Sequence, residues 1–380
     1  MHSSIEHLLE LRAALAGHSR NGHEWAVNDP VVGFLAPAFW YLYPGERKAP
    51  GGEPVPGEDV FWRNSARFTS MRYRLGKVLE RFQETGVPVI ILKGALYGDL
   101  IYPSPGLRYM SDMDLLVRNR DFRAAVRIMG ETGWEARRSC DSDNLLETIG
   151  GPDFEADWQM GEGVFFNSKG CVIDLHWHLA PYVWPRRLFR VNLDAVWQEA
   201  VLLDTPDLPG AYGLSTVHTL AYMCLHLAQH GLQQLRWLLD VDLFVRRYCD
   251  SPDWSWKNFV TCAEEWRICS AVFHALSFSR FLFDTPAPGS VLDDLDPGPA
   301  ARARLRILLR PQDLLVHPPR ALGIRYLKLV SAALVDRVPD LMRFLARLLV
   351  PDTAWRRKRY GDGTTLMQHW GRVLRAVGED

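Results

Sequence analysis

Several features that would assign this 380-residue sequence to a class at once are missing from it. It has no apolar run long enough to span a membrane, and its start, MHSSIEHLLELRAALAG, lacks the basic and apolar pattern of a secretion signal. Its six cysteines are scattered without a CxxC pair, so we expect free thiols in a reducing cytoplasm and no zinc knuckle. The formal net charge is only -1, so no overall field directs the chain to nucleic acid.

What the sequence does contain is enough apolar side chains, 47% of the total, for a sizeable core in two or three domains. Residues 1–59 are predicted to form an N-terminal helical segment, including a helix at 4–16, followed by a linker rich in glycine and proline. Residues 60–205 are predicted to form a unit of alternating helices and strands. Residues 210–380 have apolar positions three and four apart, which indicates a C-terminal helical domain.

The middle region predicts a short series of elements in a fixed order. A helix over 60–84 ends at Gly86, and the apolar run VPVIIL then predicts a strand covered on both faces. A helix of about ten residues should follow Gly94. Further strands are predicted for MSDMDLLV, residues 110–117, and for GCVIDLHWHL, residues 170–179, with a helix near 119–134 between them.

Two aspartates interrupt the apolar strand at 110–117. Side chains two apart on a strand share a face, so Asp112 and Asp114 should project together and repel each other. A hard divalent ion such as Mg²⁺ would relieve that repulsion, and it is commonly held by carboxylates together with substrate phosphates. The alternative is a strand at a sheet edge that exposes alternate aspartates to water.

A third carboxylate, Asp174, lies in the apolar run CVIDLHWHL and favours the metal interpretation. Three acids on neighbouring strands can hold two metal ions and activate a hydroxyl for phosphoryl or nucleotidyl displacement. The turn at Lys93 and Gly94 joins a strand to a helix, where backbone N–H groups and a lysine would favour phosphate.

The segments VIILKGALYGDLIYPSPGLRYMSDMDLLV, VIDLHWHL and LRWLLDVDLF resemble the uncharacterised nucleotidyltransferases of the polymerase-β-like nucleotidyltransferase superfamily. The resemblance implies an α+β fold, with a small mixed sheet flanked by N-terminal helices and a C-terminal helical domain. It also implies Asp112, Asp114 and Asp174 as ligands of Mg²⁺ or Mn²⁺, with Asp174 as the base. Arg108 and Ser111 would neighbour the triphosphate of an NTP such as ATP. The usual Gly-Ser turn of the superfamily is Lys93-Gly94 here.

The helical region supplies further candidates for the cleft. His226, Arg236 and Asp240 are implied by the resemblance to line it, although polar side chains that only join helices are the alternative. His226 and His230 are four apart in HLAQH, but the glutamate of a zinc protease is absent. His176 falls on the same face of its predicted strand as Asp174 and could contact metal or phosphate, or act by hydrogen bonding behind them.

The C-terminal part of the chain is basic. From residue 300 onward there are 16 lysines or arginines and 7 acidic residues, and Arg356, Arg357, Lys358 and Arg359 form a cluster. Such asymmetry indicates an anionic partner such as an acidic peptide or an RNA end. The alternative is that the two halves of the chain neutralise each other across their interface.

These patterns together predict a cytoplasmic, Mg²⁺-dependent nucleotidyltransferase. It would transfer NMP from an NTP to a hydroxyl of a small molecule, a peptide or protein, or an RNA end, and release pyrophosphate. Two other functions remain open from the sequence. One is a nucleotidyltransferase-like binding module without catalysis, and the other is a phosphotransferase or nucleotide hydrolase that uses the same carboxylates.

Overall fold

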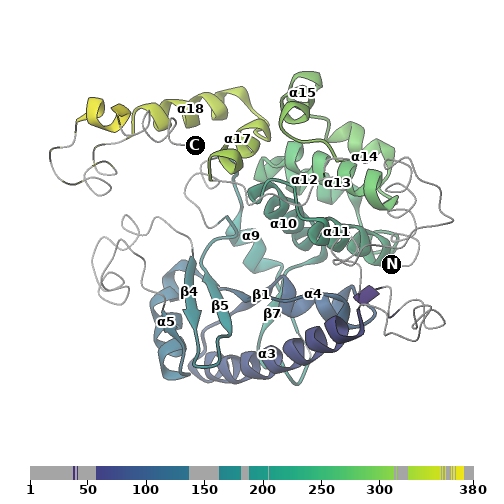
Figure 1. Cartoon of the computed structure of the whole chain (residues 1–380), viewed down its shortest axis with the longest axis vertical. Helices are drawn as coiled ribbons and strands as arrows, with labels where there is room; N and C mark the ends of the chain where they lie inside the picture. Colours follow the sequence, from purple (N-terminus) through teal and green to yellow (C-terminus); the bar gives the residue numbers. More distant parts are fainter. Residues whose placement is uncertain are drawn as a thin grey trace, which may run out of the picture.

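The computed structural model describes residues 57–136, 162–180, 188–203, 205–311 and 324–351, with short pieces at 37–38, 41, 314, 353, 356, 361, 363 and 365–371. The helix expected at 4–16 and most of the glycine- and proline-rich linker lie outside these residues. Within the described ranges, helices are long enough to pack as bundles, but none combines the length and apolar character that crossing a membrane requires. Figure 1 shows a mixed sheet between α3, which lies below it, and a helical half above it.

A mixed seven-stranded sheet forms the centre of the described fold, with the order β3-β4-β5-β2-β1-β7-β6. Strand β2 pairs antiparallel with β1 and parallel with β5, so the predicted mixed sheet is confirmed. The strands are β1 (Ile90–Leu92), β2 (Met113–Leu116), β3 (Glu135–Ala136), β4 (Glu162–Phe166), β5 (Val172–His176), β6 (Val201–Leu202) and β7 (Tyr212–Gly213).

Strand β2 is central, and all four of its residues are buried. This explains its unbroken apolar character around Asp114, since both faces of the strand are covered. The strand is shorter than the sequence predicted, because it begins at Met113 and leaves Asp112 one residue outside. The physical reason is Arg67 of α3 (Glu58–Thr85), which donates hydrogen bonds to the carbonyls of Met110 and Ser111 at 2.6 and 2.9 Å.

The helices that cover the lower face of the sheet agree with the predicted order. Helix α3 (Glu58–Thr85) corresponds to the helix expected at 60–84. Its C-cap is Gly86, whose φ of 69° suits glycine. Helix α4 (Gly94–Leu100) has seven residues instead of about ten, and α5 (Phe122–Glu131) follows β2. Because α3 buries Leu75, Leu79 and Phe82, it fixes the position of the sheet that carries the acidic residues.

Two consecutive helices stand near the start of the helical half, where the spacing of apolar positions predicted helical structure. Helix α10 (Thr216–Gln229) starts at the N-cap Ser215 and is separated from α11 (Leu235–Tyr248) by Gly231 and Leu232, both with positive φ. The other helices are α9 (Leu193–Gln198), α12 (Trp256–Trp266), α13 (Cys269–Phe283), α14 (Gly289–Asp294), α15 (Pro299–Leu308), α17 (Ile324–Ala333) and α18 (Val338–Leu349).

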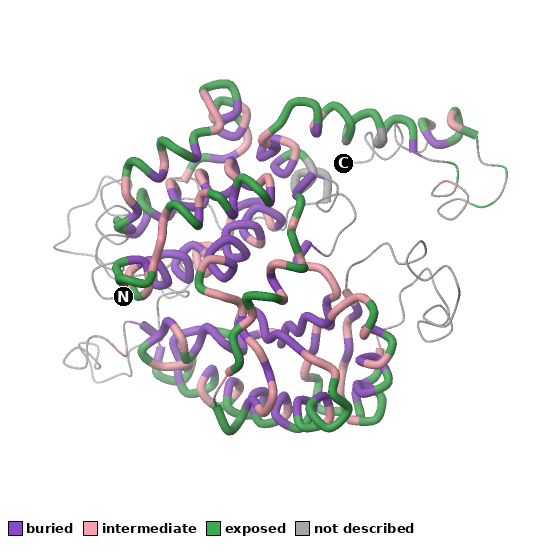
Figure 2. Tube along the Cα trace, turned by 180° about the vertical axis from the view of Figure 1, so that it is seen from behind, coloured by how far each residue is buried: buried purple, intermediate pink, exposed green. Residues whose placement is uncertain are grey.

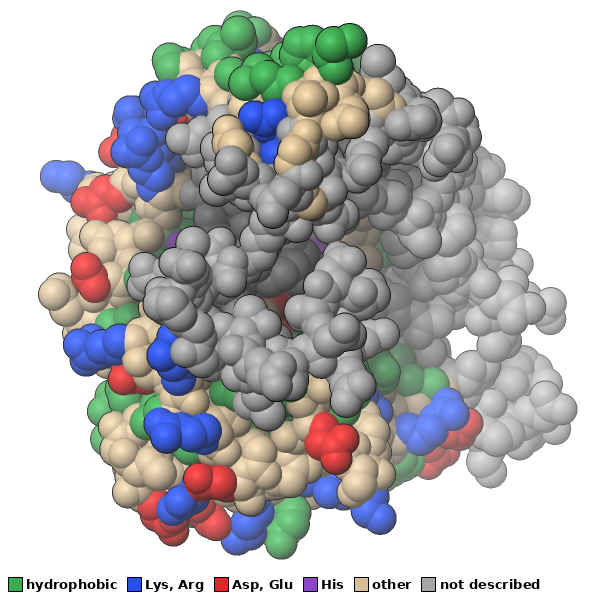
Figure 3. Space-filling view, turned by 90° about the vertical axis from the view of Figure 1, so that its left-hand side faces the viewer, with side chains coloured by type: hydrophobic (Ala, Val, Ile, Leu, Met, Phe, Trp, Pro, Cys, Tyr) green, Lys and Arg blue, Asp and Glu red, His purple; other side chains and the backbone are tan. Residues whose placement is uncertain are grey.

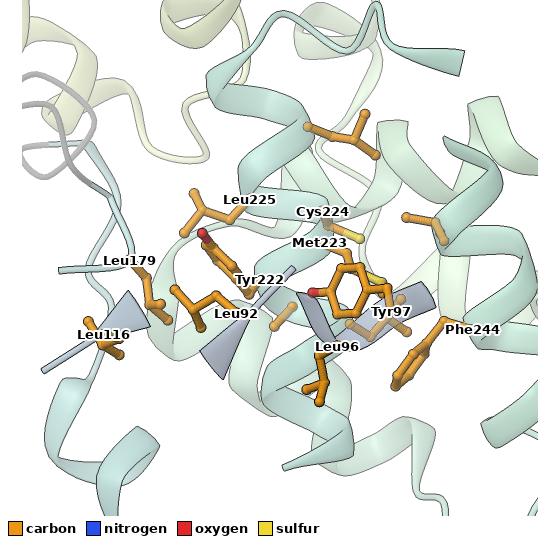
Figure 4. Close-up of a cluster of buried hydrophobic side chains, with 14 of the residues drawn as sticks. Leu92, Leu96, Tyr97, Leu116, Leu179, Tyr222, Met223, Cys224, Leu225 and Phe244 are labelled. Carbon is orange, nitrogen blue, oxygen red and sulfur yellow. The ribbon is translucent and has the colours of Figure 1, made fainter. Parts of the chain in front are cut away.

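Helix α10 lies in the middle of the molecule and is buried along most of its length, as Figure 2 shows. Figure 4 places Tyr222, Met223 and Leu225 of α10 among Leu92 of β1 and Leu96 of α4, and all of these belong to one hydrophobic core. Side chains carried by α10 are therefore held at a fixed position relative to the sheet, as a site shared by the two layers requires.

The surface gives a weaker indication of a partner than the sequence did. On the face in Figure 3, basic and acidic side chains of the coloured residues are interspersed instead of forming a field of one sign. Of the cluster predicted at 356–359, only Arg356 belongs to the described part of the chain. The proposed contact of this cluster with an anionic acceptor therefore stays a prediction. Five cysteines within the described ranges are free, as expected.

Candidate functional site

The centre of the site is a group of acidic and imidazole side chains on β2 and β5. These strands are parallel, and Asp114 stands directly beside Asp174 in their register. His176 is two residues further along β5, on the same face as Asp174. Ligand atoms of Asp114, Asp174 and His176 all lie within 4.8 Å of one another, and no second group of this kind occurs in the residues that the structure describes.

Asp114 has two partners on one oxygen. Its Oδ1 accepts a hydrogen bond from Nζ of Lys93 at 2.6 Å and lies 3.0 Å from Nε2 of His176. Nδ1 of His176 lies 3.2 Å from Oε2 of Glu162 on β4. Because the Asp114 side chain is only 2% exposed, these neighbours replace water as its electrostatic environment.

The three aspartates of the site differ in their affinity for protons. Burial alone would raise the pKa of Asp114, but Lys93 and His176 outweigh this effect and lower its pKa. Burial, followed by the charge of Asp114, raises the pKa of Asp174 to about 7 and also raises the pKa of Asp112. The site therefore contains one carboxylate that is already paired with a cation and two whose charged forms are disfavoured.

The donor atoms fit a hard divalent ion. Oδ1 of Asp174 is buried and has no hydrogen-bond partner among the residues that the structure describes, although it lies beside Asp114. Carboxylate oxygens are preferred ligands of Mg²⁺ and Mn²⁺, and imidazole is acceptable to Mn²⁺. A bound cation would lower the cost of the charged forms of Asp174 and Asp112.

A cavity of about 200 Å³ opens onto these acids and collects most of the residues predicted from the sequence. It is lined from the sheet side by Lys93, Gly94, Arg108, Ser111, Asp112, Asp114 and Asp174, and from the helical side by His226 and Arg236. His176 lies behind Asp114 and is not part of the lining. Asp240 instead lines a smaller neighbouring cavity, which shares Lys93 and Arg108 with the first.

Arg108 and Asp240 form a buried ion pair. Nη2 of Arg108 donates to Oδ2 of Asp240 at 2.8 Å, and Nε donates to Oδ1 at 3.0 Å. The hydroxyl of Tyr102 donates to the same Oδ1 at 2.7 Å. The guanidinium expected beside a triphosphate thus stands in the cavity wall, held by a carboxylate of α11. Gly94 permits this approach, because a Cβ there would lie 2.8 Å from Nη1 of Arg108.

The backbone of Lys93 adopts a conformation that favours glycine. Its φ is 49° and its ψ is -125°, at the junction where β1 ends and α4 begins. Such a conformation costs a residue with a side chain on the order of 1 to 3 kcal/mol, and strain of this kind is concentrated at functional sites. The junction turns the Lys93 side chain toward Asp114.

The helical side of the cavity also carries three uncharged rings, namely His226 on α10, His230 directly after α10 and Trp237 on α11. The ring centroids of His226 and Trp237 are 4.4 Å apart, and those of His230 and Trp237 are 4.9 Å apart. Burial, reinforced by the nearby charge of Lys93, lowers the pKa of both histidines, and that of His230 falls to about 4. Both imidazoles are therefore neutral near pH 7. Nε2 of His226 is buried without a hydrogen-bond partner in the described part of the chain.

Arg236 is a further cation of the cavity, beside Lys93 and Arg108. Its Nη1 donates to the carbonyl of Tyr109 at 3.3 Å, and its guanidinium carbon lies 5.7 Å from the centroid of the Tyr109 ring. Its Nε is buried and has no hydrogen-bond partner within the described ranges. Arg236 thus brings a positive charge with unused donor capacity to a cavity that also contains carboxylates.

Sequence reasoning did not single out Glu162, Tyr222 or Trp237 as site residues. Trp237 was visible in the run LRWLLD, whose arginine and aspartate were selected, so its position one residue after Arg236 could have suggested it. Tyr222 belongs to an apolar helical stretch that gives no separate signal. Glu162 reaches the site only through the pairing of β4 with β5, which places it opposite His176.

The fold and the site define a class before any comparison: a mixed α/β protein with a carboxylate and histidine group able to bind a metal. Residues 61–284 match a family described as uncharacterised nucleotidyltransferase. Since the match covers more than half of the chain, this protein belongs to that family. Every residue of the site described above falls inside the matched range. Comparison with the curated proteins finds none that matches the chain.

Proposed function

We propose that the protein is a nucleotidyltransferase that depends on Mg²⁺ or Mn²⁺ and moves NMP from an NTP, such as ATP, to a hydroxyl group. The observation that carries this proposal is the register of β2 and β5, which brings Asp114 and Asp174 side by side with His176 in a family of nucleotidyltransferases. The free cysteines of the described residues fit a reducing compartment, and we include a cytoplasmic location in the proposal.

Each acidic residue has a separate role in this scheme. Asp114 and Asp174, with Asp112 at the edge of the cavity, would hold divalent ions that neutralise phosphate oxygens and make the acceptor hydroxyl more acidic. Asp174, whose Oδ1 has no partner among the described residues, would take the proton of that hydroxyl. The hydroxyl oxygen then bonds to the α-phosphorus, and the bond from the α-phosphorus to the bridging oxygen breaks and releases pyrophosphate.

The cations of the cavity would bind the phosphates of the donor. Arg236 supplies a guanidinium whose Nε has no hydrogen-bond partner within the described ranges, and Lys93 supplies an ammonium that is 17% exposed. Ser111 lies at the same wall, where its hydroxyl donates to Oδ1 of Asp112 at 2.9 Å and positions that carboxylate. Arg108 would contribute charge from the wall while Asp240 fixes its position.

The three rings on the helical side of the cavity suit a planar heteroaromatic group, and we assign them to the base of the NTP. Trp237→Ala should weaken binding of the NTP about five- to a hundredfold, because stacking on an aromatic side chain contributes about 1 to 3 kcal/mol per base. Trp237→Phe should retain most of the affinity. Calorimetric titration with each of the four Mg-NTPs measures the change.

Inorganic tripolyphosphate separates the ring contact from the phosphate contact in that experiment. Its affinity should be the same for wild type and Trp237→Ala, since it has no base. Trp62, which is 56% exposed on α3 and lies outside the cavity lining, provides the matched control Trp62→Ala. Equal weakening of NTP and tripolyphosphate by Trp237→Ala would show that Trp237 supports the fold of the site and does not stack on the base.

The acceptor is a hydroxyl of a small molecule, a peptide or protein, or an RNA end, and we propose that it enters from the helical half at 210–380. The unit at 60–205 would then be the catalytic domain. Incubating the protein with a cell extract, each NTP and Mg²⁺ or Mn²⁺, followed by mass analysis for an added nucleotide, tests the function directly. Release of inorganic phosphate instead of pyrophosphate would identify a hydrolase, and release of a nucleoside diphosphate with a phosphorylated acceptor would identify a phosphotransferase. Metal-dependent binding without turnover would identify a binding module.

A further inference from the structure

Lys93 combines three features that the proposed chemistry does not by itself require. Its Nζ is 2.6 Å from Oδ1 of Asp114, its backbone has the conformation that favours glycine, and its side chain lines the cavity that would hold the nucleotide. The ammonium also lies 5.9 Å from the centroid of the Tyr222 ring, which provides a second favourable contact at the same position. This lysine is therefore held at the carboxylate by its surroundings.

The position of Lys93 affects any divalent ion that approaches the same carboxylate. Asp114 belongs to the group of possible metal ligands, yet its Oδ1 is already occupied by Lys93 and His176. An ion that binds between Asp114 and Asp174 meets a positive charge already resident on one of its ligands. At distances of a few ångströms and away from bulk water, such repulsion is strong compared with thermal energy.

The phosphates of a bound nucleotide would offer the ammonium of Lys93 a second anionic partner. Lys93 and Asp114 both line the cavity, and Arg108 and Arg236 are further cations of the same lining. A lysine side chain has four methylene groups joined by rotatable bonds, and it ends in a compact ammonium. A small movement of this side chain would replace the carboxylate oxygen by a phosphate oxygen as the partner of Nζ. Both partners are anionic, and the ammonium would keep a charge-assisted hydrogen bond in either position.

We propose that Lys93 is an exchangeable counter-ion: it neutralises Asp114 in the absence of nucleotide and passes to the phosphates when a metal–NTP complex binds. This inference rests on the proposed function and adds to it an order of binding. The protein would take up the divalent ion together with the nucleotide and bind the free ion weakly. By linkage, the nucleotide and the ion then strengthen each other's binding through this one side chain.

The first test measures the metal alone. Binding of Mn²⁺ to the full chain, followed by the electron paramagnetic resonance signal of the free ion, needs neither nucleotide nor turnover. Lys93→Met keeps an unbranched side chain that is one atom shorter and removes its charge, and it should bind Mn²⁺ about tenfold more tightly than wild type or better. Lys77→Met is the matched control, because Lys77 is exposed on α3, where its ammonium pairs with Glu80 outside the cavity.

The second test measures the nucleotide. At saturating Mn²⁺, Lys93→Met should bind the non-transferable α,β-methylene analogue of ATP about tenfold more weakly than wild type, because the phosphates lose their ammonium partner. Opposite changes for ion and nucleotide distinguish an exchangeable counter-ion from a purely structural lysine, whose loss would weaken both. Lys77→Met should leave both affinities at the wild-type values.

Lys93→Gly keeps the experiment decisive if Lys93→Met does not fold, because glycine relieves the positive φ while it also removes the charge. Mn²⁺ binding by the folded variant that is no tighter than in wild type would overturn the counter-ion role, even if NMP transfer is observed. If the Mn²⁺ and nucleotide results agree with the proposal but no NTP and acceptor give transfer, the proposed function fails while the exchange by Lys93 stands.

Discussion

Asp114→Asn is expected to abolish nucleotidyl transfer and also to destabilise the metal-free protein. The rate of transfer should fall by about a thousandfold or more. The substitution removes a carboxylate from the proposed metal ligands, which stabilise the charge that develops on the phosphate in the transition state. The free energy of unfolding should fall by about 3 to 5 kcal/mol, since Lys93, 17% exposed and 2.6 Å away, loses its partner. Activity assays and denaturant unfolding in chelator measure the two effects.

Asp174→Asn is the matched variant. Activity assays and denaturant unfolding in chelator should give a different pair of results for it than for Asp114→Asn. Transfer should again be lost, yet binding of Mg-NTP should remain measurable and the metal-free protein should be at least as stable as wild type. The reason is that burial and the charge of Asp114 raise the pKa of Asp174 to about 7, so the folded state disfavours its charged form. Equal losses of stability in the two variants would contradict the pairing of Lys93 with Asp114.

The pH dependence of that comparison follows from the direction of the shift. The folded protein holds the proton of Asp174 more tightly than the unfolded chain does. The contribution of protonated Asp174 to the free energy of unfolding of the wild type is therefore lost as the pH rises toward about 7. Any advantage of Asp174→Asn should therefore be greatest above pH 7 and should disappear toward pH 4. Unfolding in chelator at both ends of this range provides the check.

Asp240→Ala is expected to lower the free energy of unfolding by about 3 to 5 kcal/mol, the second large effect. Arg108 is 5% exposed and Asp240 is 2% exposed, so the substitution leaves a buried guanidinium without its bidentate partner. Tyr102→Phe removes one hydrogen bond to the same carboxylate and should cost about 1.5 to 3 kcal/mol. Denaturant unfolding of the full chain measures both variants.

Glu80→Ala provides the control for the buried pair. Glu80 also forms an ion pair, with Lys77 at 2.9 Å, but both side chains are more than half exposed. Its loss should change the free energy of unfolding by no more than about 1 kcal/mol, because water screens exposed pairs. Should Asp240→Ala cost no more than Glu80→Ala, Asp240 would not be the link that joins α11 to the segment before β2.

The sequence was most informative where a single segment determines the outcome. The three- and four-residue spacing of apolar positions predicted α3, α10 and α11, and Gly86 marked the end of α3 as expected. The apolar runs around Asp114 and Asp174 predicted two strands, and both are present. The motifs in and around these strands were also sufficient to indicate the nucleotidyltransferase family.

The extent of the strands was harder to predict, because competition from other segments decides where a strand begins. The pattern of residues 110–117 continues without a break, yet β2 starts only at Met113. The carbonyls of Met110 and Ser111 are taken by Arg67, which lies more than forty positions earlier in the chain. No local pattern contains that information.

By itself, the sequence determined the helices, the two acid-bearing strands and the chemical character of the site, because these depend on local spacing and residue type. The tertiary structure decided which groups meet. It paired Lys93 with Asp114, gave Arg108 to Asp240 and placed Trp237 in the same cavity as the acids. Such contacts depend on strand register and on the packing of α10 and α11 against the sheet. A charged side chain could pair with many groups, and only the folded backbone decides which of them lies within reach.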